Sequence, residues 1–532
     1  MKIKNKKIGI FSFFFAFIAL VGCEKDFLQT EPLDNVSNTI FWQTQEDAEI
    51  ATNNLYNYLY DTEIFEWESI TDIVAADISS HGLTEIMYAR GQQQSDNPYG
   101  ERMWDYSYNG IRATNDVLHN IDQVQNISPE LLSRLKGEAR FIRAYLYSYL
   151  IMFYGDVPLI IQPLGIEESK SLSRTNKEEV WNFIATELQE ISDDLPVSYN
   201  NANTGRITKG AALAMKSRAM LWAERYTEAK VAAKAVIDLN QYSLYPSYEN
   251  LFTYDAENNQ EVILDKQFIR DTYSNNVFFR IAPNSQNSAT SDYYPTANIV
   301  NAYETGQGLS IDDPNSGYDP RNPYENRDPR LDYSIFVYGD ELPNGQTYDP
   351  RPGYGGPDEV TRSFETTGTG FNIEKYVTTD DLSDPQNSGL NIILFRYAEV
   401  LLNFAEAKIE LNELDQEVYT AINNVRQRAD VNMPPIQSGL SIEVLRETVR
   451  HERLVELAFE GSRFFDIRRW GIAHEVMNGQ IPGLTYLSQD GELKTYYVTD
   501  YELSFNPLRD YLWPIPQKEM ELNPNYEQNP GY

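Results

Sequence analysis

The segments TKGAALAMKSRAMLW (residues 208–222) and TEAKVAAKAVIDLN (residues 227–240) decide the fold class of this chain. Apolar and small residues recur in both at helical spacing, and only residues 223–226 connect them. Alanines at close spacing let two helices approach closely, as in tetratricopeptide-like hairpins. A second pair of this kind occurs far downstream, at residues 395–413 and 414–430. The sequence therefore predicts a mostly α-helical scaffold built of helix pairs.

Further helices are predicted from their capping residues. Ser128 provides an N-cap before a first-turn proline, and apolar residues then recur at helical spacing until Gly155. Thr175 and Glu178 match a capping box at the start of another apolar stripe, which ends at Pro196. These patterns extend the helical scaffold toward the N-terminus.

Residues 38–532 are predicted to form a single domain. Its helical scaffold is expected mainly at residues 38–245 and 391–475. Residues from about 246 to 390 are rich in Pro, Gly, Asn, Asp, Tyr and Ser, which predicts a large loop-rich insertion with a few short strands. Long loops on a rigid scaffold commonly carry recognition, so we expect much of the binding surface there. Residues 476–532 are expected to be irregular.

The first residues of the chain have the pattern of a lipoprotein signal peptide. Four lysines precede a run from Ile8 to Val21 that is apolar except for Ser12. A helix needs about 20 apolar residues to cross a bilayer, so this run is too short for a permanent anchor. The following Gly22-Cys23 completes a likeness to the bacterial lipobox, in which the cysteine sulfur receives a diacylglycerol. We predict a signal peptide at residues 1–22, lipidation of Cys23 and a flexible tether at residues 23–37.

Composition disfavours several classes of function. The net charge is −35, and loss of the signal peptide removes four lysines and no acids, which takes the mature chain to about −39. Nucleic acid needs a basic face, so it is not an expected partner. Cys23 is the only cysteine, so no intramolecular disulfide is expected. The 37 tyrosines suit surfaces that stack against ligands.

Motifs for catalysis and metal binding are incomplete. His451-Glu452 begins an H-E-x-x-H pattern, but position 455 is Val. The segment from Asp313 resembles a calcium loop, but Tyr324 stands where a bidentate glutamate belongs. We therefore predict binding without catalysis, metal or cofactor. Calcium at this loop and a glycosidase carboxylate pair stay open as alternatives.

Five regions carry a family resemblance, and they occur in the family's order along the chain. They are FIRAYLYSYLIMFYGDVP (141–158), NRDPRL (326–331), FRYAEVLLNFAEAK (395–408), INNVRQRAD (422–430), and ERLVELAFEGSRFFDIRRW (452–470) with LWPIPQKEMELNPNYEQNPGY (512–532). Together they resemble the SusD-like (RagB/SusD) outer-membrane lipoproteins of Bacteroidetes, which serve nutrient uptake. The resemblance implies tetratricopeptide-like helix pairs supporting a looped binding face. It also implies a surface-exposed, lipid-anchored protein that lies as a hinged lid over a SusC-like TonB-dependent outer-membrane transporter.

Candidate ligand contacts follow from sugar chemistry and from this resemblance. A neutral sugar presents apolar C–H faces and a rim of hydroxyls, so aromatic rings stack on it while Asp, Asn and Arg bracket the hydroxyls. The region from Trp67 to Arg102 and the insertion hold this mixture. The predicted contacts are Trp67, Asp72, Asp77, His81, Tyr88, Arg90, Tyr293, Tyr294, Arg362 and Tyr376.

The predicted function is that of a glycan-binding lipoprotein at the cell surface. It would capture oligo- or polysaccharide and deliver it to the transporter without turnover of its own. One alternative keeps the family but changes the cargo to peptides or protein fragments, as in RagB-type uptake. A second alternative is a surface glycoside hydrolase.

Overall fold

The computed structural model describes residues 41–59, 78–80, 87–360 and 362–532. The predicted signal peptide, Cys23 and the tether lie outside the described residues. Within the described part of the chain, every helix is too short or too polar to cross a membrane.

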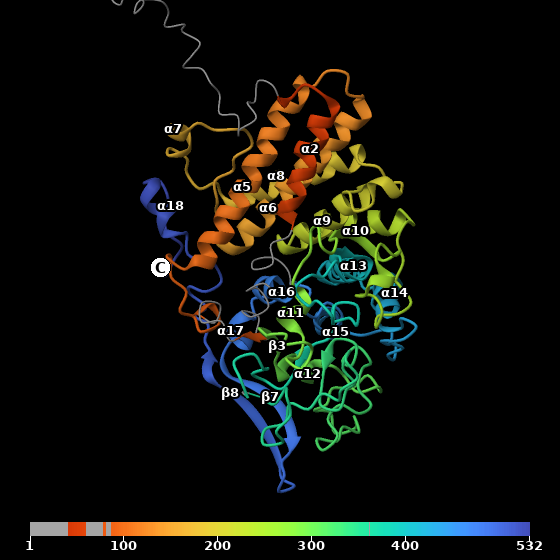
Figure 1. The fold of residues 1–532 in the computed structure, drawn as a ribbon. Helices are drawn as coiled ribbons and strands as arrows, with labels where there is room; N and C mark the ends of the chain where they lie inside the picture. Colours follow the sequence, from red (N-terminus) through yellow and green to blue (C-terminus); the bar gives the residue numbers. More distant parts are fainter. Residues whose placement is uncertain (1–40, 60–77, 81–86, 361) are drawn as a thin grey trace, which may run out of the picture.

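Helices form the upper part of the molecule and much of its centre, as Figure 1 shows. They pack as neighbours in an order close to that of the chain: α5 on α6, α6 on α8, α8 on α9, α9 on α10, and α13 on α10, α14 and α15. The scaffold helices are α2 (Gln45–Leu55), α5 (Pro98–Asn120), α6 (Pro129–Tyr154), α8 (Lys177–Asp194), α9 (Lys209–Trp222), α10 (Tyr226–Asp238), α13 (Tyr397–Glu410), α14 (Gln416–Arg426) and α15 (Ile442–Glu456). The predicted helix pairs are therefore confirmed, at α9 with α10 and at α13 with α14.

Of the two predicted caps, Ser128 is confirmed and Thr175 is wrong. Ser128 accepts a hydrogen bond from the Leu131 N–H at the start of α6 (3.2 Å), and Thr208 caps α9. Helix α8 is capped by Asn176, whose side chain accepts from the Glu178 N–H (2.9 Å). Thr175 instead forms a β-bridge with Val157. That extended pairing fixes the Thr175 backbone outside the helix, so the cap moves to the next residue.

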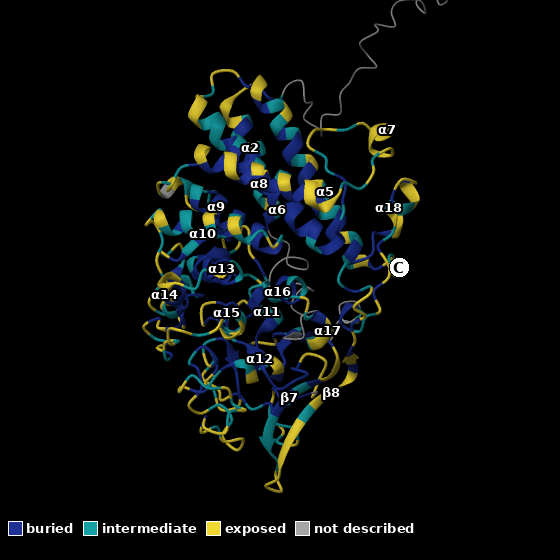
Figure 2. Cartoon of the chain, turned by 180° about the vertical axis from the view of Figure 1, so that it is seen from behind, coloured by how far each residue is buried: buried dark blue, intermediate teal, exposed yellow. Residues whose placement is uncertain are grey.

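The core lies where the helices approach most closely. Helix α6 is buried along most of its length, between α5 and α8 (Figure 2). At Gly110 of α5, an added Cβ would lie 2.4 Å from Leu146 Cδ1 of α6, so this crossing requires glycine. Small residues also allow α9 and α10 to pack closely, since Ala211, Ala212 and Ala233 are fully buried.

The insertion contains short elements joined by turns. Its antiparallel pairings are β1 with β3, β2 with β6 and β4 with β5, so strands within the insertion pair with each other and with segments on either side of it. The strands are β1 (Ile78–Ser80), β2 (Val262–Lys266), β3 (Tyr293–Pro295), β4 (Ile335–Phe336), β5 (Asn372–Ile373) and β6 (Ile392–Arg396), and the helices are α11 (Val277–Ile281) and α12 (Ala297–Ala302).

The C-terminal segment differs from the expectation of an irregular chain. Strands β7 (Gly479–Leu487) and β8 (Leu493–Leu503) form an antiparallel hairpin that projects from the lower end of the molecule (Figure 1). Thr and Tyr residues on both sides of the Gln489-Asp490-Gly491 turn, and Val498 after it, favour this hairpin. The remaining short helices are α7 (Ile166–Ser169), α16 (Arg463–Arg469), α17 (Ala473–Val476) and α18 (Gln517–Leu522).

Candidate ligand-binding site

The described part of the predicted binding region meets the insertion at the β1–β3 pairing. Ser79 lies opposite Tyr294 in the antiparallel register. The two parts of the predicted site are therefore adjacent here, although more than 200 residues separate them along the chain. Four predicted contacts lie outside the described residues: Trp67, Asp72, Asp77 and His81.

The hairpin holds these segments together. Tyr501 of β8 shares a hydrogen bond with Ser79 (Oη···Oγ 2.9 Å), and the Ser504 N–H donates to the Ala89 carbonyl (2.9 Å). On the other side, the Leu484 N–H donates to the carbonyl of Thr369 (2.8 Å). The element that the sequence prediction missed therefore joins three distant segments of the predicted site.

Four of the predicted aromatic contacts are core residues in this structure. Tyr293 and Tyr294 expose only 2% and 1% of their surface, and Tyr88 and Tyr376 are also buried. Tyr293 accepts a hydrogen bond from Arg280 (2.6 Å), and Tyr376 accepts one from the Ile393 N–H (3.2 Å). Burial raises the pKa of Tyr88 and of Tyr294 above the usual range for a phenol. A sugar cannot stack on rings that are covered in this way.

The two predicted arginines are nearer the surface. Arg90 is partly buried, beside the segment that β8 holds. Arg362 is exposed and donates from Nη1 to the carbonyls of Gly355 (2.9 Å) and Gly356 (2.8 Å). Arg362 therefore stabilises the conformation of its own loop.

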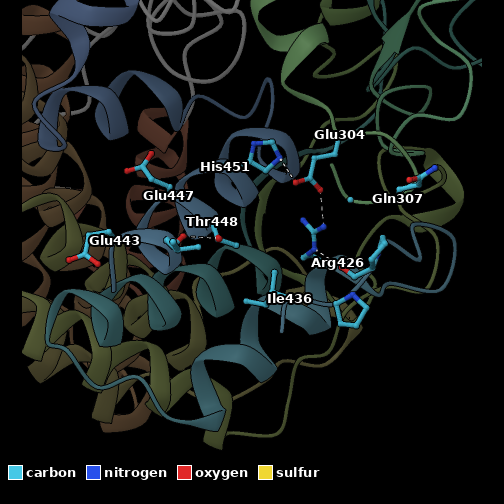
Figure 3. Close-up of a pocket in the computed structure, with 12 residues that line it drawn as sticks. Glu304, Gln307, Arg426, Ile436, Glu443, Glu447, Thr448 and His451 are labelled. Atoms are coloured by element: carbon cyan, nitrogen blue, oxygen red, sulfur yellow. Dashed lines mark hydrogen bonds and ion pairs between the residues drawn. The ribbon is translucent and has the colours of Figure 1, made fainter. Parts of the chain in front are cut away.

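Described residues line two neighbouring cavities, each of about 620 Å³. Glu304 and His451 line both, so the two cavities meet at this pair. Figure 3 shows the first cavity, with Glu443, Glu447 and His451 along one side. These residues are four apart on α15, a spacing that places them on one helix face. The second cavity is lined by amides and acids of α12, α17 and the hairpin, among them Asn298, Asn301, Glu475, Asn478 and Gln480.

An ion-pair network fixes the shared wall of the cavities. Arg426 donates to Glu304 (Nη2···Oε2 2.8 Å) and to the buried Glu452 (Nη1···Oε2 2.8 Å), while His451 Nε2 lies 3.8 Å from Glu304 Oε1. Glu452 also accepts from Arg330 (2.6 Å). Burial alone would lower the pKa of Arg426, but Glu452 and Glu304 outweigh it and raise that pKa. Arg426 therefore stays charged and holds Glu304 in place.

The chemistry of this double cavity suits hydroxyl groups. Carboxylates accept hydrogen bonds from the hydroxyls of a polar ligand, and amides both accept and donate them. The described residues that line it include no Phe, Tyr or Trp, so it lacks a ring on which a sugar could stack. In the described part of the chain, no group of three or more His, Cys, Asp or Glu is placed to hold a metal ion. In the segment that resembles a calcium loop, Asp313 and Asp319 accept hydrogen bonds from the backbone N–H groups of Asn315 and Arg321.

Two family models match this chain. The model described as "SusD family" matches residues 260–532, and the model described as "Starch-binding associating with outer membrane" matches residues 26–221. The first match alone covers just over half of the chain.

The chain belongs to the SusD family.

Similar proteins match this chain along nearly its whole length. A SusD-like carbohydrate-binding protein of Bacteroides fragilis, known as a crystal structure, superposes with a TM-score of 0.84 at 31% identity, over 91% of this chain and 99% of that chain. The SusD-like protein P2 of Formosa agariphila is 27% identical over 98% of this chain and 99% of its own. The starch-binding protein SusD of Bacteroides thetaiotaomicron is 24% identical over 85% of this chain and 81% of its own. The predicted SusD-like, mostly helical fold is confirmed.

The double cavity of this SusD-family protein was not predicted from its sequence. Glu304, Arg426 and His451 come from three distant segments, and His451 drew notice only as half of a zinc motif. The one local signal is the spacing of Glu443, Glu447 and His451 on α15. That pattern is also common on solvent-exposed helix faces, so it could not single out a cavity.

Proposed function

We propose that this protein is a glycan-binding lipoprotein of the outer membrane, exposed at the cell surface. It captures oligo- or polysaccharide and passes it to a SusC-like TonB-dependent transporter, acting as a lid and without catalysis. The observation that carries the proposal is the match to SusD-family models along most of the chain. The names of two relatives, one a carbohydrate-binding and one a starch-binding protein, support glycan as the ligand.

The lipid anchor completes this proposal. Cys23, as the first residue after cleavage, would carry the acyl chains, and residues 24–37 would let the folded domain move beside its transporter. Two or more acyl chains hold a protein at a bilayer far more firmly than one chain. The name of the model that matches residues 26–221 includes association with the outer membrane, which agrees with this placement.

We further propose that the ligand contacts the region around the β1–β3 pairing. Trp67, Asp72, Asp77 and His81 flank β1 in the sequence, and Arg90 follows it. The support is the β1–β3 pairing itself, which places this segment against the insertion. Loops that meet on a rigid framework provide a preformed binding face.

Titration calorimetry tests the proposed function. The protein carries Cys23→Ser so that it stays in solution, and it is titrated with soluble fragments of starch, laminarin, xylan and mannan. We expect heat of binding with at least one, and no reducing sugar released over time. Tight binding to peptides with no response to any glycan would overturn the glycan proposal in favour of peptide uptake. Steady release of reducing sugar would instead indicate a hydrolase.

The transporter partnership needs a separate experiment. Outer membranes are solubilised in mild detergent and the acylated protein is purified through a C-terminal tag. We expect a TonB-dependent barrel to co-purify with it in a fixed ratio. Its absence from cross-linked and uncross-linked samples alike would overturn the lid proposal and leave glycan binding intact.

A further inference from the structure

Three side chains of the insertion form a single stack. The guanidinium carbon of Arg351 lies 3.8 Å from the ring centroid of Tyr338 and 3.8 Å from that of Tyr354. Two rings at this distance on one face of a guanidinium would collide at their edges. Each ring therefore takes one face, and Arg351 is held between them.

The loop that carries this stack is fixed by its own side chains. Arg351 pairs with Asp349 through two hydrogen bonds, Nε···Oδ1 at 2.9 Å and Nη2···Oδ2 at 2.8 Å. Glu359 accepts from the N–H groups of Gly353 (2.6 Å) and Gly355 (2.7 Å). Such bonds order the loop before any ligand arrives, which lowers the entropy cost of binding to it.

The loop is also attached to the turn end of the β7–β8 hairpin. Tyr354 donates its hydroxyl hydrogen to the Leu487 carbonyl (3.1 Å), and Gln489 Nε2 donates to the Gly353 carbonyl (2.5 Å). The stack therefore belongs to a surface supported by two separate parts of the chain. Tyr338 itself follows β4, whose two residues are buried.

Tyr338 keeps an open ring face. It is 40% exposed although Arg351 covers one face, so the exposed area includes the opposite face. Tyr273 is exposed to a similar extent, but Phe268 stacks against it in nearly parallel planes (5.4 Å, 9°) and Lys266 Nζ lies 5.0 Å from its centroid. Of these two tyrosines, Tyr338 is therefore the better candidate for stacking against a ligand.

Electrostatics select the kind of partner. Arg351 already interacts with one face of the Tyr338 ring, so a second cation on the outer face would share the same ring electrons and gain less from cation–π attraction. Asp349 neutralises Arg351, so the stack as a whole has no net charge. A neutral, flat, apolar group suits this face better than a lysine or arginine side chain of a peptide.

We propose that Tyr338 is a stacking subsite for a neutral pyranose unit, with Arg351 and Tyr354 as the residues that position its ring. The C–H face of the sugar would lie on the outer face of Tyr338. The subsite rests on the proposed glycan-binding function and adds a contact outside the residues predicted from the sequence.

Affinity electrophoresis and calorimetry test the subsite. Wild type, Tyr338→Ala, Tyr338→Phe and the control Tyr497→Ala are run in native gels that contain starch, laminarin, xylan or mannan, and are then titrated with oligosaccharides of each polysaccharide that retards the wild type. Tyr497 is a matched control because it is 44% exposed on β8 and has no part in the stack. We expect Tyr338→Ala to lose about three- to tenfold in affinity, while Tyr338→Phe and Tyr497→Ala stay within about twofold.

The outcomes separate this subsite from the proposed function. A wild type that binds no polysaccharide overturns both. A wild type that binds, with an unchanged affinity in Tyr338→Ala, overturns the subsite alone. A loss in Tyr338→Phe as large as in Tyr338→Ala also overturns it, because stacking needs the ring and not the hydroxyl. Equal circular dichroism spectra and unfolding midpoints show that the variants are folded.

Discussion

At the scale of single residues, the most constrained acid is Glu456 on α15. Its carboxylate accepts hydrogen bonds from Arg396 (2.7 Å), Arg428 (2.8 Å) and Arg330 (2.9 Å), and all four side chains are buried. Burial alone would raise the pKa of Glu456, but the three guanidinium groups outweigh it and lower that pKa far below its usual value. Three residues from different segments thus meet on one carboxylate.

Replacing Glu456 with Gln should strongly destabilise the protein. The change leaves buried arginines without their shared counter-charge, which typically costs about 3–5 kcal/mol of unfolding free energy. Urea denaturation at pH 7 measures the loss. Glu447→Gln is the control, because Glu447 is exposed on the same helix and its pairing with Arg450 contributes little. A loss below about 1 kcal/mol in Glu456→Gln would contradict the importance of the network.

Asp340 should make stability fall as the pH rises. Burial raises the pKa of Asp340 from 3.8 to about 7, while the hydrogen bond from the Val337 N–H (2.6 Å) opposes the shift. Between these two pKa values the native carboxyl keeps its proton and the unfolded one loses it, so native stability decreases from about pH 4 to pH 7. Asp340→Asn keeps an acceptor for Val337 and removes the charge.

We therefore expect Asp340→Asn to melt at a higher temperature than wild type at pH 8. At pH 4 the difference in melting temperature should be much smaller, because the native carboxyl is protonated there and the unfolded one, near its pKa of 3.8, is only partly ionised. Thermal melts at several pH values provide the measurement. An equal difference at pH 4 and pH 8 would mean that the titration of Asp340 does not couple to folding.

At the scale of elements, the N-cap of α9 links two parts of a helix pair. Thr208 Oγ1 accepts from the Ala211 N–H (3.1 Å) and shares a hydrogen bond with the Tyr242 hydroxyl (3.1 Å) beyond the end of α10. We expect Thr208→Ala to lower the unfolding free energy by about 1 kcal/mol or slightly more, and Thr208→Ser to retain most of it. Chemical denaturation of the three proteins tests this. Equal losses in both variants would assign the effect to the methyl group instead of the cap.

The elements differ in how well the sequence predicts them. Helices such as α6 and α9 have both a polar cap and an apolar period, and these two local signals agree. Helix α8 was predicted with its cap one residue early, because the bridge between Thr175 and Val157 is a tertiary contact that no local pattern contains. The β7–β8 hairpin had a local signal, at the turn before Gly491, but the prolines around it favoured an irregular interpretation.

Candidate binding residues are harder to locate from the sequence than helices, for a physical reason. Tyrosine has an apolar ring and a polar hydroxyl, so it is equally suited to a ligand face and to a core in which its hydroxyl finds a partner. Tyr293 illustrates the second case, with Arg280 as its partner. Whether a given tyrosine is open, as Tyr338 is, depends on neighbours from distant segments. Composition could therefore indicate a stacking surface but could not locate it.

At the scale of the whole molecule, the strong negative charge bears on the proposed anchor. With the predicted signal peptide removed, a charge of about −39 would keep the folded domains apart in solution and would offer no attraction to an anionic membrane surface. In the described part of the chain, no helix can cross a bilayer. The proposed attachment therefore depends on the acyl chains at Cys23.

Replacing Cys23 with Ser should separate attachment from folding. We expect the wild type to sediment with outer membranes, and Cys23→Ser to leave the membrane fraction even at low salt, because no charge attraction replaces the lipid. The variant should keep the circular dichroism spectrum and unfolding midpoint of the wild type, since the cysteine precedes the packed domain by a polar segment. If Cys23→Ser still sediments with membranes that lack the transporter, a protein surface rather than the lipid binds the bilayer. If it sediments only where the transporter is present, the lid contact itself is strong enough to retain the protein.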